Sequence, residues 1–157
     1  MENIQKEELV ALRQTNIGRL FQRAARAYSE RALTKLHVRG HEGITLFHTA
    51  LIANLDLEGT RISTLAHRAG MSKQAMGQLV TDLSTRDYIE KKPDPEDKRA
   101  SLIFFTDLGW QLLQDAFLVK KEIEAEYAAV LGESEMAQLR DYLEQLLADS
   151  VNRVHGE

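Results

Sequence analysis

Four polar residues at the start of an expected helix are of types that bind DNA. They are Ser72, Lys73, Gln74 and Gln78. Gln can form two hydrogen bonds with adenine, and Lys can reach guanine or a phosphate oxygen. Because any helical hairpin can carry a polar outer face, these residue types alone do not separate DNA contact from an ordinary solvated helix. Their surroundings decide between the two interpretations.

A charged loop follows between two short apolar runs, residues 88–89 and 102–105. The runs are rich in aromatic and β-branched residues, which predicts paired strands. Arg99 near the hairpin tip can enter the narrow minor groove, where negative potential is concentrated, and Asp97 could orient its guanidinium or bond the loop backbone. The loop residues that we expect at the DNA surface are Lys91, Lys92, Asp97, Lys98 and Arg99. The alternative is a charged hairpin that meets only solvent.

A helix-turn-helix must position the first group of residues. Gly70 stands where the turn needs a positive φ, and Ser72 can cap the second helix by accepting a backbone hydrogen bond. The apolar positions that we expect to hold the two helices together are Leu65, Ala69, Met71, Met76 and Leu79. Followed by the charged hairpin, this order predicts a winged helix-turn-helix, with a recognition helix over residues 72–86 and a wing over residues 88–105.

Capping residues and glycines predict where the neighbouring elements begin and end. The residues expected to cap a helix are Thr45, Ser63 and Thr106, and Ser134 is expected to start the last helix. Gly132 is expected to end the long helix that follows the wing. Arg61 and Ile62 could add a short third strand beside the wing.

The same residues resemble the MarR family of bacterial transcriptional regulators. Residues 72–80, 93–99 and 106–109 carry the resemblance, through the Asp-x-Arg of the wing and the Thr-x-x-Gly that starts the next helix. Asp87 departs from the pattern, since relatives often have Gly there, but Asp tolerates the left-handed region better than most residues. The resemblance covers nearly the whole chain. It implies a homodimer of winged helices that binds a near-palindromic operator, most simply as a repressor.

We expect a mainly α fold with a small antiparallel β wing, formed by one MarR-type domain over residues 1–157. Within it, residues 44–106 are the winged helix-turn-helix region, and residues 1–36 and 107–157 are dimerisation helices. Both flanking segments carry apolar residues at three- and four-residue steps. These stripes could form the domain's own core. Our hypothesis is that they interlock with a second copy, which would space two recognition helices about 34–36 Å apart.

The resemblance also implies an effector site, because small molecules, often aromatic acids or phenolics, bind this family between the dimer helices and the winged domain. The residues expected at that junction are His37, Arg39, His41, Phe47 and His48. Three histidines so close together also allow a pH-sensitive or metal-binding role, or the ordinary role of exposed or hydrogen-bonded loop residues. With no cysteine nearby and no His-x-x-x-His on a firm helix, we predict no metal site and no cofactor.

The composition is that of one compact domain without disulfides. The chain has 157 residues and no cysteine, which excludes thiol-based redox sensing. Its net charge of −4 is unevenly distributed, because residues 60–99 hold eight basic and six acidic residues, whereas residues 100–157 hold four and eleven. The local field at the docking face matters for DNA binding. We therefore expect the acidic C-terminal part to face away from the phosphates.

Other classes of protein fit the sequence less well. We find neither a Gly-rich phosphate loop nor a nucleophile with a base and an orienting group, so we do not expect an enzyme. The N-terminus lacks a long apolar run, so we expect no signal peptide, no membrane partner and a cytoplasmic location. A winged helix that binds proteins instead of DNA is the remaining alternative, because a fold alone does not define a function.

Overall fold

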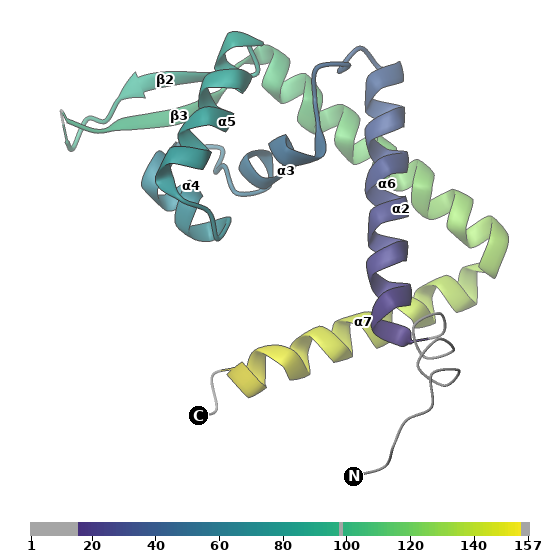
Figure 1. The fold of residues 1–157 in the computed structure, drawn as a ribbon. Helices are drawn as coiled ribbons and strands as arrows, with labels where there is room; N and C mark the ends of the chain where they lie inside the picture. The colour runs from purple at the N-terminus through teal and green to yellow at the C-terminus, as the bar shows by residue number, and fades with distance from the viewer. Residues whose placement is uncertain (1–15, 98, 155–157) are drawn as a thin grey trace, which may run out of the picture. The chain divides into compact units, whose positions relative to one another are not determined.

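The computed structural model describes residues 16–97 and 99–154 and is mainly helical with one small sheet (Figure 1). The helices are α2 (Ile17–Val38), α3 (Leu46–Ile52), α4 (Ile62–Arg68), α5 (Lys73–Thr85), α6 (Asp107–Leu131) and α7 (Glu133–Val154). The strands are β1 (Thr60–Arg61), β2 (Ile89–Pro93) and β3 (Ser101–Phe105). This confirms the expected fold class. The chain groups into two compact units that divide between residues 117 and 118, and each is described by itself.

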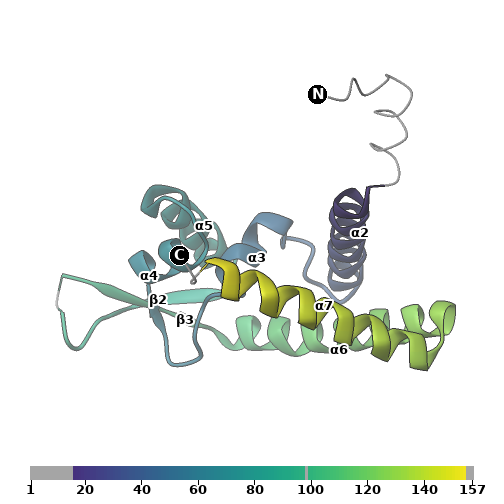
Figure 2. The same ribbon diagram turned by 90° about the horizontal axis from the view of Figure 1, so that it is seen from below.

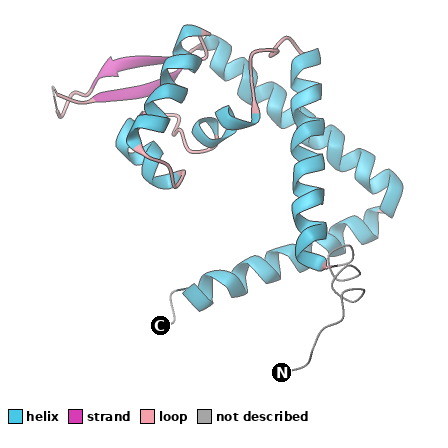
Figure 3. Cartoon of the chain, viewed as in Figure 1, coloured by secondary structure: helices cyan, strands magenta, loops and turns pink. Residues whose placement is uncertain are grey.

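The sheet is antiparallel in the order β1-β3-β2. Figure 3 shows the two longer strands, β2 and β3, in magenta. Ile89 pairs with Phe105, and Lys92 pairs with Leu102. Ile103 and Phe105 point to the buried face of β3, as the alternation of side chains along a strand requires. The β2–β3 hairpin extends beyond α4 and α5 in both ribbon views (Figure 1 and Figure 2). The expected wing is therefore confirmed.

The helix-turn-helix is formed by α4 and α5 around a fully buried centre. Leu65 of α4 and Met76, Val80 and Leu83 of α5 are all 0% exposed. Ala69, Met71 and Leu79 are only half-buried, so the core of the motif lies deeper along α5 than we expected. The reason is that the buried positions of α5 recur every three or four residues, at Met76, Val80 and Leu83, and so continue toward the C-terminal end of the helix.

The turn between these helices has the expected local chemistry. Gly70 has a φ of +62°, in the left-handed region that favours glycine. The Met71 N–H donates to the Ala66 carbonyl at 2.9 Å, which closes the end of α4. The Ser72 Oγ then accepts a hydrogen bond from the Ala75 N–H at 3.1 Å, which confirms Ser72 as the N-cap of α5.

A second left-handed residue ends α5 and directs the chain into the wing. Asp87 has a φ of +64°, as expected of the residue that replaces the family's glycine. The Tyr88 N–H donates to the Leu83 carbonyl at 3.0 Å, so the last turn of α5 is closed. The Thr106 hydroxyl donates to the Asp87 carbonyl and accepts from the Gly109 N–H, which confirms Thr106 as a cap. The end of α5 and the start of α6 are thus joined.

Gly109 is where the first turn of α6 meets the base of the wing. A Cβ at this position would lie 2.1 Å from the Tyr88 carbonyl oxygen, closer than any side-chain carbon can approach backbone. The Thr-x-x-Gly pattern therefore has two functions. Thr106 caps the helix, and Gly109 allows the backbones to pack together.

Three expected boundaries were wrong by one or two residues. Ser63 does not cap α4, because Arg61 is the N-cap and Ile62 already belongs to the helix. For the same reason β1 covers Thr60 and Arg61 and excludes Ile62. Ser134 lies inside α7, which begins at Glu133. The helices start earlier because the preceding residues already have the extended backbone of a cap or the positive φ of a chain reversal.

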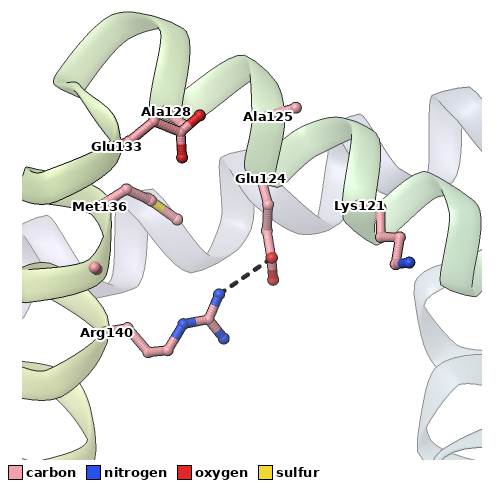
Figure 4. Close-up of a pocket in the computed structure, with 8 residues that line it drawn as sticks. Lys121, Glu124, Ala125, Ala128, Glu133, Met136 and Arg140 are labelled. Carbon is pink, nitrogen blue, oxygen red and sulfur yellow. Dashed lines mark hydrogen bonds and ion pairs between the residues drawn. The ribbon is translucent and has the colours of Figure 1, made fainter.

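The second unit contains the end of α6 and all of the described part of α7. Gly132, with a φ of +105°, lies between the two helices and confirms the expected end of α6. A shallow groove runs along this hairpin, and the guanidinium of Arg140 lies 3.1 Å from Glu124 Oε2 across it (Figure 4). No helix among residues 16–97 and 99–154 is long and apolar enough to cross a membrane.

Candidate nucleic-acid interface

The outer face of α5 carries all four polar residues of the first group. Ser72, Lys73, Gln74 and Gln78 are exposed. Gln74 and Gln78 are one helical turn apart and therefore lie side by side, away from the buried face of Met76 and Val80. Across residues 16–97 and 99–154, the side chains of Lys73, Gln74 and Gln78 form no hydrogen bond or ion pair. Their polar atoms are available to an external partner.

The N-terminus of α5 adds a backbone contribution to this face. The first N–H groups of a helix lack partners within the helix and carry partial positive charge, which favours phosphate. Ser72 satisfies one of them, and its own hydroxyl hydrogen remains able to donate. Lys73 lies at the same end of α5, so a phosphate there would meet both a cation and backbone donors.

The inner side of α5 is held by a buried histidine. His48 of α3 is 3% exposed, and its Nδ1 accepts a hydrogen bond from the Thr45 N–H at 3.1 Å. The proton must therefore be on Nε2, which donates to Asp82 Oδ2 at 2.7 Å. Two hydrogen bonds lower the pKa of Asp82, and the one from His48 has a larger effect than the one from Arg86. His48, one of the residues predicted at an effector site, thus connects α3 to the recognition helix.

The wing tip is shaped by Asp97. Its Oδ1 accepts a hydrogen bond from the Arg99 N–H at 3.0 Å, and its carbonyl accepts one from the Ala100 N–H at 2.8 Å. Of the two roles considered for Asp97, the bond to the loop backbone is the one present. The Arg99 side chain is exposed. Lys98 lies outside the described residues.

Lys91 and Lys92 differ in what surrounds them. Both are exposed and both lie on β2. The Lys92 ammonium is 2.8 Å from Glu90 Oε1 and 5.2 Å from the centre of the Phe104 ring. Part of its charge is therefore already balanced, and a phosphate would have to compete with Glu90 for it.

An ion pair that we did not foresee supports the wing from the side. Asp94 is only 4% exposed, and its Oδ2 accepts a hydrogen bond from Arg61 Nε at 2.6 Å. Its Oδ1 accepts another from the Glu96 N–H at 2.9 Å. The hydrogen bond from the Glu96 N–H is the largest cause that lowers the pKa of Asp94. The hydrogen bond from Arg61 lowers it further, whereas burial acts in the opposite direction. The one signal in the sequence was an acid between two prolines, whose carboxylate needs donors if it is buried.

The residues expected at an effector site are dispersed over several environments. His37 donates from Nε2 to the Ile44 carbonyl at 2.8 Å, and Phe47 is 78% exposed. His41 is buried, with Nε2 3.1 Å from Asp115 Oδ2 and Nδ1 3.0 Å from the Tyr88 hydroxyl.

The structure brings two of these residues together around one carboxylate. Arg39 Nε lies 3.6 Å from the other oxygen of Asp115, opposite His41. This group links the loop after α2 to α6 and, through the Tyr88 hydroxyl, to the base of the wing. His48 belongs to the separate group at Asp82.

Comparison with known families agrees with this geometry. Residues 42–100, which contain α3, both helices of the motif and most of the wing, match the model of the MarR family. This match in sequence supports the resemblance to the MarR family over the part of the chain that holds the recognition helix. No curated protein matches the chain in sequence.

Solved structures of MarR-type regulators share the fold. A crystal structure of MarR is 20% identical, with a TM-score of 0.71, and 87% of this chain and 98% of that one are covered. The PcaV regulator of Streptomyces coelicolor with its natural ligand is 22% identical, with a TM-score of 0.63 and coverage of 96% and 99%. A mutant of MepR from S. aureus bound to an oligodeoxyribonucleotide is 20% identical, with a TM-score of 0.61 and coverage of 85% and 97%.

Proposed function

We propose that this protein is a MarR-type, sequence-specific regulator of transcription that binds double-stranded DNA as a homodimer. The observation that carries the proposal is the outer face of α5. Its two glutamines and its lysine have no internal partner among the described residues and are exposed, and a hairpin that carries exposed lysines and Arg99 follows α5. The MepR structure with an oligodeoxyribonucleotide supports it, because that protein has the same fold.

The proposed docking places α5 in the major groove. Ser72, Lys73, Gln74 and Gln78 would meet base edges and nearby phosphates, since these types form the common contacts of a recognition helix. Arg99 would enter the adjacent minor groove from a turn whose backbone Asp97 holds. The wing lysines at positions 91, 92 and 98 would contact phosphates, which position the protein but do not read sequence.

The proposed homodimer rests on apolar side chains that are exposed at both ends of the chain. On α2, Ile17 is 62% exposed and Phe21 is 43% exposed. On α7, Leu143, Leu146 and Tyr142 are exposed as well. Exposed apolar residues on each of these helices are typical of an interaction surface, because leaving them in water is unfavourable. A monomer in sedimentation equilibrium at micromolar concentration would argue against this part of the proposal.

A small aromatic or phenolic effector is the second part of the proposal. The PcaV structure contains that protein's natural ligand, so a protein of this fold can hold a small molecule. Among the predicted residues, Phe47 is open to solvent and Arg39 is a quarter exposed, whereas His41 and His48 are buried. An effector can act only by binding the DNA-competent and incompetent shapes with different affinities. Repression would follow if the operator overlaps a promoter.

The test of DNA binding is a selection from randomised duplexes, followed by fluorescence anisotropy across a salt series. We expect a near-palindromic site to be enriched and bound more tightly than a scrambled duplex, with affinity falling as salt rises. Equal, weak binding to both duplexes would contradict sequence-specific recognition. No binding even at low salt would favour a winged helix that binds proteins. Adding 4-hydroxybenzoate to the operator complex tests the effector, and we expect it to release the DNA.

A further inference from the structure

Gly77 lies in the middle of the recognition helix, where glycine is an unfavourable residue. Helix α5 runs from Lys73 to Thr85, so Gly77 belongs to its second turn and not to either end. Apart from proline, glycine is the least stabilising residue in a helix interior, because it loses the most backbone freedom on folding. Its φ is not positive, so no turn geometry requires it. A reason for glycine here must lie in the space around it.

No contact within the described chain accounts for that space. Apart from its chain neighbours and the nearby backbone of its own helix, a Cβ built on Gly77 would meet no described atom within 4 Å. The contrast with Gly109 is informative, since a Cβ there would lie 2.1 Å from the Tyr88 carbonyl oxygen. Gly109 is explained by the packing of the protein itself, whereas Gly77 leaves an open notch on the surface.

The notch lies among the residues proposed to read DNA. Gly77 follows Gln74 by three residues and Lys73 by four, which makes all three neighbours on the helix surface. The Gly77 carbonyl already accepts a hydrogen bond from the Thr81 hydroxyl at 2.9 Å, in addition to its place in the helix. What the position offers to a partner is therefore room for close approach.

We propose that Gly77 is a specificity-determining position that lets a base edge in the major groove approach the backbone of α5. A side chain at this point would push that base edge away and weaken the hydrogen bonds of Gln74 and Gln78 beside it. Glycine is the residue that permits such close approach of a backbone to a ligand. The inference rests on the proposed DNA-binding function and adds a position whose contribution is the absence of a side chain.

The decisive experiment measures stability and DNA binding of Gly77→Ala together. The thermal midpoint of the free protein should rise, because alanine favours the helix and meets nothing. Affinity for the selected operator should fall about tenfold, while affinity for a scrambled duplex stays nearly constant. Gly77→Leu should weaken operator binding further. Opposite signs for stability and affinity separate this role from damage to the fold.

Thr85→Ala is the matched control. Thr85 ends the same helix, is exposed and is outside the proposed contacts; its hydroxyl donates to the Thr81 carbonyl at 2.9 Å, so this change alters the helix but should leave operator binding unchanged. Unchanged operator affinity in Gly77→Ala would overturn the inference, as would a lower thermal midpoint. An equal loss on both duplexes would also overturn it, since the close approach would then involve phosphates. Failure of the wild-type protein to select any site would overturn the proposed function itself, and the inference with it.

Discussion

The recognition helix and the wing present their polar side chains in different ways. On α5, Gln74 and Gln78 have no partner among the described residues, and the backbone is held from behind by the His48–Asp82 hydrogen bond. In the wing, Asp94 and Lys92 are already engaged with Arg61 and Glu90. The two glutamines on the outer face of α5 stay free because the backbone hydrogen bonds of the helix fix its shape. The hairpin needs side-chain interactions to define its shape.

This difference changes how the basic residues near a DNA-binding element should be interpreted. Two of those in and beside the wing, Arg61 and Lys92, already interact with acids of this chain. Exposed pairs of this kind are weak and exchange readily, whereas the buried carboxylate of Asp94 strongly requires its donors. The number of lysines and arginines therefore overestimates how many phosphates the wing can bind.

The largest expected effect is that of replacing Arg99, whose side chain is exposed at the wing tip. Arg99→Ala should cost about 1–3 kcal/mol of operator binding, or roughly 5- to 150-fold in affinity. Arg99→Lys is the control, because it retains charge but removes the planar guanidinium. If Arg99→Lys binds like the wild type and Arg99→Ala changes only the salt-dependent part of binding, Arg99 meets phosphate alone and the minor-groove role is wrong.

Removing a side chain of α5 that contacts a base should reduce sequence preference more than it weakens binding to any duplex. Gln74→Ala should reduce the difference in binding free energy between the operator and a scrambled duplex by about 1–3 kcal/mol, because alanine cannot form the two hydrogen bonds that glutamine makes with a base. Competition titrations with single-base variants of the operator would locate that base. Equal losses on every duplex would show that Gln74 only positions the helix.

Breaking the Arg61–Asp94 pair should affect stability in a pH-dependent manner. The pKa of Asp94 is lowered, so its interactions stabilise the fold above the ordinary aspartate pKa of about 3.9 and are lost as the pH falls through the lower folded value. Asp94→Asn should therefore unfold at a lower temperature than the wild type at pH 6. The two thermal midpoints should converge in strong acid. A constant difference over this range would mean that the charge of Asp94 is unimportant.

The smallest expected effect separates the two neighbouring lysines. Removing a lysine that binds a phosphate lowers the slope of log affinity against log salt by about one. Lys91→Ala should show this decrease, and Lys92→Ala should show less, because Glu90 already balances its charge. In a Glu90→Gln background the effect of Lys92→Ala should grow to match that of Lys91→Ala. If Lys91→Ala and Lys92→Ala lower the slope equally both with and without Glu90→Gln, the ion pair with Glu90 does not affect how Lys92 binds phosphate.

Local features of this protein could be predicted from its sequence because they depend on residues close together in the chain. The positive φ of Gly70 and Asp87, the caps at Ser72 and Thr106, and the pairing of the wing strands were all confirmed. Each depends on turn chemistry, capping or alternation over a few residues. The order of these elements was enough to identify the fold class.

Partners far apart in the sequence were decided by the tertiary structure. Arg61 meets Asp94 because β1 and β2 both pair with β3, and His41 meets Asp115 because α6 returns past the loop after α2. The three histidines near residue 40 looked like one group, yet they hydrogen-bond to three different partners. Spacing along a turn does not say which way a side chain faces. The sequence by itself determined which elements form, and long-range packing alone decided which polar groups are engaged and which remain free to bind.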